Sequence, residues 1–273
     1  MLYIRSFIYN ALFYVVLIGL MVFGLPILAM SRHATFWLAR LWGKASIWML
    51  DRICGTKVEF RNLHNIPNGA YIIAPKHQSI WETFALLLHA PDFSYVLKRE
   101  LMWLPLFGQY LWSAEQIAIN RSKGKSSLNQ VVARARDLFA TDRQLFIFPE
   151  GTRRPVGAPP AYKFGVAQVY GECGVPCLPV ALNSGVFWPR RSFLRRPGTI
   201  VVDYLEPIAP GLSKQDFLTE LQSRIETRTN ELVAEAIARD PSLAALIASD
   251  AAGNEAEAEP LAVRAQTDMR RVE

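Results

Sequence analysis

Cysteine is scarce in this chain of 273 residues, which contains only Cys54, Cys173 and Cys177. An odd and sparse set of cysteines does not make a disulfide framework, so we expect a reducing compartment. Cys173 and Cys177 lie close together in the sequence, but no second pair of ligands accompanies them, and we expect no metal site. The composition therefore argues against a disulfide-stapled secreted domain and against a zinc-stabilised fold.

Charge is absent from Ala11 to Met30. A helix of about 20 residues rises roughly 30 Å, which is the thickness of the hydrocarbon core of a bilayer. We interpret this stretch as a membrane segment, and Gly24 and Pro26 could let it bend into a helical hairpin that dips into one leaflet. A cleaved signal peptide is the alternative, although its apolar stretch usually has about 7 to 15 residues.

Positive charge is unevenly distributed around this apolar segment. Arg5 is the only cationic residue before it, whereas Arg32, Arg40, Lys44 and Arg52 follow it. Because cytoplasmic flanks carry the excess of Lys and Arg, this asymmetry predicts an inner (cytoplasmic) membrane protein whose main domain faces the cytoplasm.

The whole chain carries a formal charge of +6, with 51% hydrophobic residues. Such a charge suits anionic lipid surfaces or phosphorylated substrates, and by itself it would equally suit nucleic acid. Residues 34–53 interleave aromatic and aliphatic side chains with cations. That pattern is typical of an interfacial helix, and a helix packed on the main domain would show it as well.

From about residue 56 onward, short β-rich runs alternate with helical patterns, which predicts an α/β fold with a mixed, largely parallel sheet covered by helices. The predicted strands are 57–60, 71–74, 94–97, 116–119, 145–148, 177–182 and 199–204. The predicted helices are 80–90, 125–141, 162–172 and 214–239. We therefore divide the chain into a two-helix membrane-attachment segment (1–54), one catalytic domain (55–240), and a frayed helix leading to a disordered tail (241–273).

A histidine and an acid lie where the second predicted strand ends. His77 follows this strand, and Glu82 comes five positions later, beyond the expected start of a helix at Ser79. The carboxylate could therefore approach the imidazole and orient it as a base. Residues 79–82 also form a capping box, in which Glu82 would only close the helix start. Spacing alone leaves both roles open, and His77 could be an ordinary hydrogen-bonding side chain.

A second polar turn follows the predicted strand 145–148. Its sequence is Pro-Glu-Gly-Thr-Arg, in which Gly151 permits backbone angles that are closed to other residues. Thr152 can donate a hydroxyl, and the planar guanidinium of Arg153 suits phosphate. Taken alone, a β-turn with a solvated arginine would look the same.

Together these residues resemble the glycerolipid acyltransferases, typified by bacterial 1-acyl-glycerol-3-phosphate acyltransferase. Four segments match the motifs of this family in order, between residues 77 and 180. These segments are His77 to Glu82; Lys98, Glu100, Leu101, Pro105 and Gly108; Phe148 to Arg153; and Val175-Pro176 with Pro179-Val180. The resemblance extends more loosely from about residue 56 to 210, and residues 1–53 match the apolar helices of the family only in kind.

The resemblance implies a glycerol-3-phosphate acyltransferase-like fold and an activity. A fatty acyl group would pass from a thioester, acyl-CoA or acyl carrier protein, to the sn-2 hydroxyl of lysophosphatidic acid (1-acyl-glycerol-3-phosphate), giving phosphatidic acid. The thioester is a co-substrate, so no bound cofactor, no metal and no nucleic acid is expected, and membrane lipids are the expected partners. The thiol of a thioester leaves readily, and the chain has no Gly-x-Ser-x-Gly sequence that would mark a serine nucleophile.

The resemblance also implies roles for individual residues. His77 would remove the proton of the acceptor hydroxyl while Glu82 holds the ring. Cations would surround the acceptor phosphate, although Lys98 and Arg121 could equally be solvated charges at strand ends. The complete substrate-binding set implied by the resemblance is Lys98, Arg121, Glu150, Gly151, Thr152 and Arg153.

Two residues depart from the usual pattern of the family. The acid of the first motif is most often aspartate, whereas this chain has Glu82, and the residue before the histidine is often asparagine, whereas this chain has Lys76. The choice of acceptor is therefore open, and a lyso-ornithine lipid or a lysophospholipid is the nearest alternative. A membrane-bound thioesterase and a non-catalytic membrane module are more distant alternatives.

Overall fold

The computed structural model describes residues 1–120 and 124–251. Within these residues a seven-stranded sheet has the order β1-β7-β6-β2-β5-β3-β4. Its strands are β1 (Thr56–Arg61), β2 (Tyr71–Pro75), β3 (Phe93–Lys98), β4 (Ile117–Ile119), β5 (Gln144–Phe146), β6 (Cys177–Leu182) and β7 (Gly198–Tyr204). Neighbouring strands are parallel except β6 and β7. The prediction of a mixed, largely parallel sheet is confirmed.

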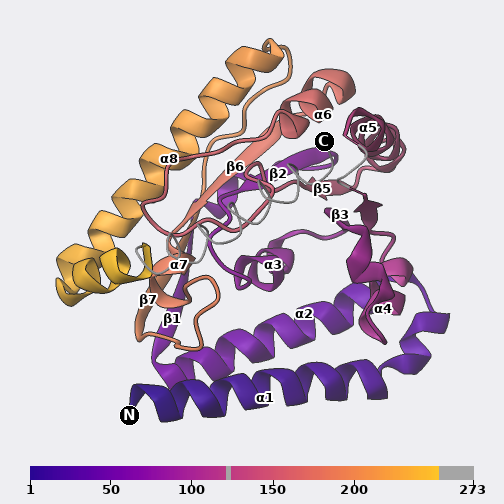
Figure 1. Ribbon diagram of the computed structural model, residues 1–273. Helices are drawn as coiled ribbons and strands as arrows, with labels where there is room; N and C mark the ends of the chain where they lie inside the picture. The colour runs from indigo at the N-terminus through magenta and orange to yellow at the C-terminus, as the bar shows by residue number, and fades with distance from the viewer. Residues whose placement is uncertain (121–123, 252–273) are drawn as a thin grey trace, which may run out of the picture.

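Helices cover both faces of the sheet (Figure 1). One face carries the amino-terminal helices α1 (Leu2–Phe23), η1 (Leu25–Ala29), α2 (Arg32–Met49) and η2 (Leu50–Cys54), followed by α3 (Glu82–Ala85) and η4 (Leu86–His89). The other face carries α5 (Lys125–Phe139), α6 (Gly165–Cys173) and α8 (Lys214–Arg239). Successive strand residues point to opposite faces, so Ile73 joins the core under the hairpin and Ile72 joins the core under α5, α6 and α8.

The amino-terminal helices form an antiparallel hairpin that lies along the domain (Figure 1). Tyr9 of α1 donates a hydrogen bond to the Ser46 carbonyl of α2 over 3.3 Å. Phe13 packs on Phe84 of α3, with ring centroids 5.6 Å apart. The hairpin is therefore part of the hydrophobic core of the protein, because its inner side chains are buried together with those of the sheet.

The outer side of the hairpin is apolar and exposed. Phe36 of α2 is buried, whereas Trp37 is 59% exposed and Trp48 is 61% exposed. Residues 34–53 thus have both properties that the sequence left as alternatives, a face packed on the domain and an exposed aromatic face. Among the described residues, α1 is the single helix that is long and apolar enough to cross a membrane, and 17% of its most apolar window is buried.

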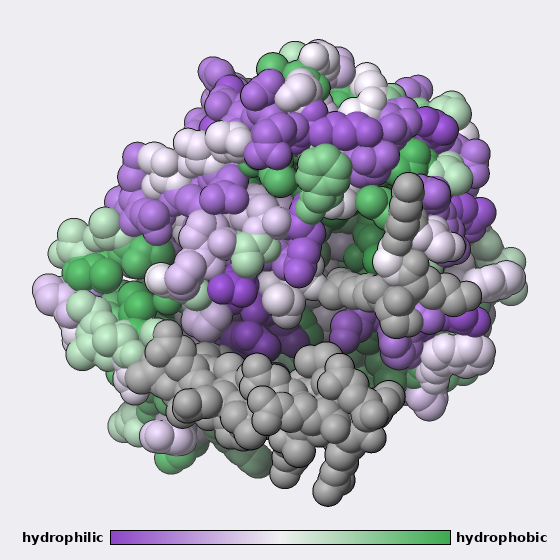
Figure 2. Space-filling view, turned by 45° about the horizontal axis from the view of Figure 1, so that its top comes forward, coloured by the Kyte–Doolittle hydropathy of each residue, from purple (hydrophilic) through white to green (hydrophobic). Residues whose placement is uncertain are grey.

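The opposite layer has a polar outer surface. Figure 2 shows hydrophilic residues over most of the upper half of the molecule, where α5, α6 and α8 come forward. These helices bury one stripe each, such as Phe217 and Leu221 of α8, and leave their remaining residues in water. This amphipathic arrangement differs from that of α1, whose apolar residues lie on its exposed side as well.

The last described segment is a short helix that packs on the domain. The sequence analysis expected a frayed helix after residue 240, and Ser242–Ala251 form a helix. Its Leu243 is buried in the core, and Arg196 forms a salt bridge with Asp250 over 2.8 Å. These contacts order a segment whose alanine-rich composition alone does not indicate packing. Residues 252–273 lie outside the described part of the chain.

Smaller elements connect the strands. The link between β3 and β4 holds η5 (Arg99–Trp103) and α4 (Phe107–Ser113), η3 (Leu63–Asn65) precedes β2, and α7 (Ser184–Phe187) follows β6. The helix expected over residues 80–90 is divided into the single turn α3 and the 3₁₀ helix η4. Its first turn is irregular because the backbone N–H groups of Gln78 and Ser79 bond to a side chain, as described below.

Candidate active site

The predicted site residues come from neighbouring parallel strands. β2, β5 and β3 lie side by side, and their carboxyl ends lead to His77, to the turn 148–153 and to Lys98, respectively. Adjacent strands are about 4.8 Å apart, so these three segments lie within roughly 10 Å of one another along the sheet edge. Ligands of open α/β sheets bind at this edge. Arg121 follows β4, the next strand, but it lies outside the described residues.

A hydrogen bond joins the predicted base and acid. His77 Nδ1 lies 3.0 Å from Glu82 Oε1. A carboxylate only accepts, so Nδ1 carries the hydrogen and Nε2 keeps the lone pair that can take a proton. The ring also stacks on Phe148, with centroids 3.9 Å apart. The His77 side chain is 14% exposed, whereas that of Glu82 is completely buried, so an oriented imidazole retains limited access to solvent.

Glu82 has the capping role as well as the orienting role. Its Oε1 accepts the backbone N–H groups of Gln78 and Ser79, each over 2.7 Å. Its Oε2 accepts the hydroxyl of Ser184 over 2.8 Å. The sequence left open whether Glu82 caps the helix start or contacts the imidazole, and in the structure it makes both contacts. The amides of Gln78 and Ser79 are occupied, so they are not oxyanion donors in this conformation.

Ser184 was missed by the sequence analysis. It is the first residue of α7 and lies 102 positions from Glu82 in the chain. A signal was available, because Ser184 follows β6, and a polar residue just beyond the carboxyl end of a parallel strand faces the same edge as His77. Nothing in the local sequence, however, indicates which acid it contacts.

The turn after β5 bonds to the backbone of His77 at both its N–H and its carbonyl. The His77 N–H donates to Glu150 Oε2 over 3.0 Å, and the His77 carbonyl accepts the N–H of Arg154 over 2.8 Å. Arg153 therefore lies next to a residue that is bonded to His77. Glu150 is fully buried behind the histidine. Its observed contacts are with Lys76 and with the N–H of His77, and its shaping of the phosphate end of the site stays a prediction.

Lys76 lies in the interior beside this carboxylate. Its Nζ is 2.9 Å from Glu150 Oε1 and 2.6 Å from Glu226 Oε1 of α8, and Tyr162 donates its hydroxyl to the same Glu226 oxygen. Burial raises the pKa of Glu150, and the ammonium of Lys76 and the N–H of His77 oppose that rise. The sequence had marked Lys76 only as a departure from the usual asparagine.

The predicted phosphate-binding side chains border the same edge. Lys98 and Thr152 are exposed and Arg153 is half-buried. Among the described residues, neither Lys98 nor Arg153 has a salt-bridge partner, so both cations are available to an anion. Gly151 has a φ of 65°, the left-handed region that favours glycine, and its N–H bonds to the Phe148 carbonyl as the turn closes.

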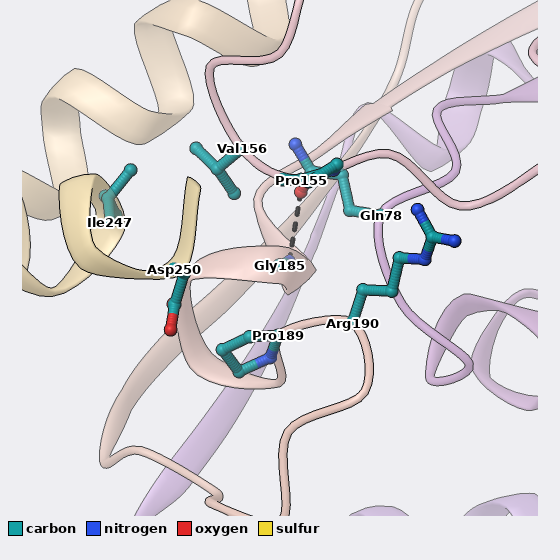
Figure 3. Close-up of a pocket in the computed structure, with 8 residues that line it drawn as sticks. All are labelled: Gln78, Pro155, Val156, Gly185, Pro189, Arg190, Ile247 and Asp250. Carbon is teal, nitrogen blue, oxygen red and sulfur yellow. Dashed lines mark hydrogen bonds between the residues drawn. The ribbon is translucent and has the colours of Figure 1, made fainter. Parts of the chain in front are cut away.

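A small pocket beside the site shows how α7 is attached. Gln78, Pro155, Val156 and Gly185 are among its lining residues, and its volume of about 10 Å³ is too small for an acyl chain or a glycerol phosphate. Figure 3 shows the side chain of Gln78 reaching the N–H of Gly185, a bond of 3.0 Å. A Cβ on Gly185 would lie 2.8 Å from Val156 and 2.9 Å from Gln78, so this close approach requires glycine.

The cysteines offer no activated nucleophile. Burial raises the pKa of the Cys54 thiol to about 11, and it raises the pKa of Cys173 and of Cys177 above the usual value. All three therefore remain thiols at neutral pH, whereas a nucleophilic cysteine needs a lowered pKa. Among the described residues no group of three His, Cys, Asp or Glu side chains is placed to hold a metal ion.

Comparison with known proteins agrees with the motifs and with the fold. A family model described as Acyltransferase matches residues 57–183. The 1-acyl-sn-glycerol-3-phosphate acyltransferase of Pseudomonas aeruginosa is 36% identical over 214 residues, which cover 77% of this chain and 81% of the relative. The corresponding alpha enzyme of Mus musculus is 28% identical over 167 residues, 59% of each chain.

A solved structure has the same fold. The crystal structure of the 1-acyl-sn-glycerophosphate (LPA) acyltransferase PlsC from Thermotoga maritima superposes with a TM-score of 0.73 at 20% identity, covering 86% of this chain and 98% of the other. At this identity the agreement concerns the fold alone. With its four ordered motifs, its histidine–glutamate pair and its Pseudomonas relative, the chain belongs to the acyltransferase family.

Proposed function

We propose that this protein transfers a fatty acyl group from a thioester to the sn-2 hydroxyl of 1-acyl-glycerol-3-phosphate and so forms phosphatidic acid. One observation carries the proposal: a buried carboxylate orients His77 through Nδ1 and leaves Nε2 available, and the His77 carbonyl accepts the N–H of Arg154, the residue after Arg153. The printed names of the relatives from Pseudomonas aeruginosa and Mus musculus support the choice of acceptor.

The reaction needs one base and an activated carbonyl. His77 Nε2 removes the proton of the acceptor hydroxyl while the oxygen attacks the thioester carbon. Glu82 stabilises the imidazolium through the bond to Nδ1. The carbon–sulfur bond then breaks, and the imidazolium returns its proton to the leaving thiolate, whose conjugate acid has a pKa of about 8.5. Because the donor is already activated, no covalent acyl-enzyme is required.

The acceptor phosphate is bound by the cations of the second and third motifs. Arg153 offers a planar, bidentate donor, and Lys98 adds a second charge from the neighbouring strand β3. Arg121 completes the predicted set, and Thr152 and Gly151 shape the turn around the phosphate. Two or three cations offset the charge of a phosphate dianion and place the glycerol between that site and His77.

The donor and the membrane complete the proposal. Acyl-CoA or acyl carrier protein supplies the thioester, and the enzyme works without a bound cofactor or metal. The exposed apolar side of the hairpin, which includes Trp37 and Trp48, lies in the cytoplasmic leaflet of the inner membrane. The catalytic domain is then in the cytoplasm, where it meets membrane lipids and lysophosphatidic acid at the surface.

The test is an assay of detergent-purified protein with lysophosphatidic acid and labelled acyl-CoA, in which the lipid product is identified. Labelled phosphatidic acid is the expected product. If label enters only a lyso-ornithine lipid or a lysophospholipid, that lipid is the acceptor instead of lysophosphatidic acid. Release of free fatty acid that is independent of any acceptor would show a thioesterase instead.

Arg153→Ala tests the acceptor more sharply. Hydrogen bonds to a charged group contribute about 1.5–3 kcal/mol, so kcat/KM for lysophosphatidic acid should fall roughly 30-fold. Arg136→Ala is the matched control, because Arg136 lies on α5 and is paired with Glu172 at the surface. Equal activity of the Arg153→Ala protein and the wild type on phosphorylated acceptors would remove Arg153 from the phosphate site.

A further inference from the structure

Lys76 is the residue whose position in the structure the sequence explains least. Its ammonium is buried, with 3% of the side chain exposed, directly behind the catalytic histidine. Long cationic side chains are almost never buried unless they are paired. Lys76 is paired twice, with Glu150 of the third motif and with Glu226 of α8, residues that are 74 and 150 positions away in the chain.

These contacts form a continuous chain of hydrogen bonds that ends on His77. Tyr162 donates to Glu226, and Lys76 donates both to Glu226 and to Glu150. The second oxygen of Glu150 accepts the N–H of His77. Each member bonds to the next within 3.0 Å, so the network connects α8 and the loop after β5 to the backbone of the base.

The charges in this network are unequal. Two carboxylates, those of Glu150 and Glu226, share the single ammonium of Lys76, and Glu150 has no exposed side-chain surface. A carboxylate in such a place keeps its charge only when a cation compensates for the lost hydration. A charged acceptor also makes a hydrogen bond that is about twice as strong as that of a neutral one. The strength of the hydrogen bond from the His77 N–H to Glu150 therefore depends on the charge of Lys76.

We propose that Lys76 is a positioning residue for acyl transfer: its ammonium keeps the buried carboxylate of Glu150 ionised, and that carboxylate holds the backbone of His77 so that Nε2 stays aimed at the acceptor hydroxyl. This inference rests on the proposed role of His77 as the base. It assigns a function to Lys76, Glu226 and Tyr162, and it places Glu150 behind the base.

The pH dependence of turnover distinguishes this role of Lys76 from a purely structural one. Removing one partner of a buried ion pair lowers stability whatever its role, but a purely structural role would leave the pH profile of turnover unchanged. If Lys76 keeps Glu150 charged, its loss must let Glu150 bind a proton at a higher pH, because burial already raises the pKa of this carboxyl. Turnover would then fall at neutral pH and recover in alkaline solution.

The experiment compares Lys76→Met with the double variant Lys76→Met/Glu150→Gln in the full-length protein, in the lysophosphatidic acid assay. For Lys76→Met we expect the acid limb of the pH profile to move up by about one unit, so that kcat at any pH well down that limb falls about tenfold. The double variant should have its acid limb at the wild-type position, since position 150 no longer titrates. Lys214→Met is the matched control, because Lys214 joins α8 to Glu172 and Gln168 of α6, and its acid limb should not move.

Two outcomes would overturn the proposal. One is an acid limb in Lys76→Met that coincides with that of the wild type, and the other is a double variant that keeps the displaced limb. If the methionine variant does not fold, Lys76→Gln, which keeps a neutral donor, is judged by the same criteria.

Melting temperatures test the inference without any assay. The double variant should melt above Lys76→Met because one of the two uncompensated carboxylates, the fully buried Glu150, is gone. A double variant that melts no higher counts against the role of Lys76. If the wild type is inactive in the assay but the double variant still melts above Lys76→Met, the proposed function is wrong. Lys76 would then still compensate the charge of Glu150.

Discussion

The two edges of the sheet each hold a cluster of charged residues, and the clusters differ in one respect. At the carboxyl edge, the buried Lys76 pairs with Glu150, whose other oxygen accepts the N–H of His77. At the amino edge, Asp92 before β3 accepts from Arg32 of α2 and from Arg143 before β5, over 2.9 and 2.8 Å. Both clusters join segments that are distant in the sequence.

The difference lies in what each cluster leaves available. The amino-edge cluster pairs every charge with another charge, and Arg143 also bonds to Glu115. The carboxyl-edge cluster keeps one ring nitrogen with a lone pair beside two cations that have no salt-bridge partner among the described residues. Ion pairs therefore join segments at the amino edge, whereas at the carboxyl edge they lie beside the residues of the proposed active site. Substitutions should accordingly affect stability at the amino edge and turnover at the carboxyl edge.

His77→Ala should have the largest effect. A positioned general base contributes about 10²- to 10⁴-fold, and we expect kcat to fall roughly 10³-fold. The loss of one stacked, partly exposed ring should cost little stability. The comparison of edges predicts unchanged circular dichroism and a melting temperature close to that of the wild type. Turnover above a tenth of the wild-type value would show that another group is the base.

Asp92→Asn should have the largest effect on stability. Removing one partner of a buried charge pair costs about 3–5 kcal/mol, and the partial exposure of this cluster points to the lower figure, about 3 kcal/mol. Denaturant unfolding measures it, and kcat of the folded fraction should stay within twofold. Glu115→Gln is the control, because Glu115 is half-exposed and its loss should cost under about 1 kcal/mol. A fall in kcat of more than twofold in the folded protein would contradict the contrast between the two edges.

The same cluster has a predictable pH dependence. Burial raises the pKa of Asp92, but the bonds and charges of Arg32 and Arg143 outweigh it and hold that pKa below the usual value. Its contribution to stability is therefore fully present above the unfolded pKa of about 3.9 and is lost as the pH falls through the lower, folded pKa. Acid titration of unfolding should show this loss below about pH 4 in the wild type, and Asp92→Asn should lack it.

Glu82→Gln sharpens the contrast within the site. The amide oxygen can still accept from Gln78 and Ser79, so the cap survives and stability should fall by about 1 kcal/mol. The imidazolium loses its counter-charge, and kcat should fall about 10²-fold. Turnover that stays within a few-fold of the wild type while stability drops would reduce Glu82 to its capping role.

Ser184→Ala should have the smallest effect. It removes the one hydroxyl that bonds to Glu82 Oε2 and leaves the pair with His77 intact. Because Glu82 would be held less firmly, we expect the activation free energy to rise by about 1 kcal/mol, which lowers kcat roughly fivefold. KM for both substrates should stay unchanged. Steady-state kinetics measure both constants. A change confined to KM would assign Ser184 to substrate binding instead.

Much of the fold was predictable because its signals are local. Each predicted strand overlaps an observed one, since a β-strand of this sheet is a short apolar run bounded by turn residues. The helix predicted over 214–239 has those limits in the structure, with Ser213 capping Asp216. The pairing of His77 with Glu82 was also within reach, because only five positions separate them.

The contacts that complete the site were not predictable in the same way. Ser184 reaches Glu82 across 102 positions, and Glu226 reaches Lys76 across 150. Periodicity and spacing report on neighbours in the chain, whereas these contacts depend on the order in which strands pair and on which helix covers them. For the same reason the sequence left residues 34–53 undecided and did not indicate that residues 242–251 pack on the domain.

By itself, the sequence determined the alternation of strands and helices, the apolar hairpin and the motifs to which we assign a base and an anion site. Each of these is set by local propensity or short-range spacing. Only the tertiary structure decided that Glu82 serves as cap and orienter at once, that Glu150 lies behind the histidine, and that Lys76 is buried between two acids. Burial and long-range pairing set these roles, because a charge acquires its partner only when the chain is folded.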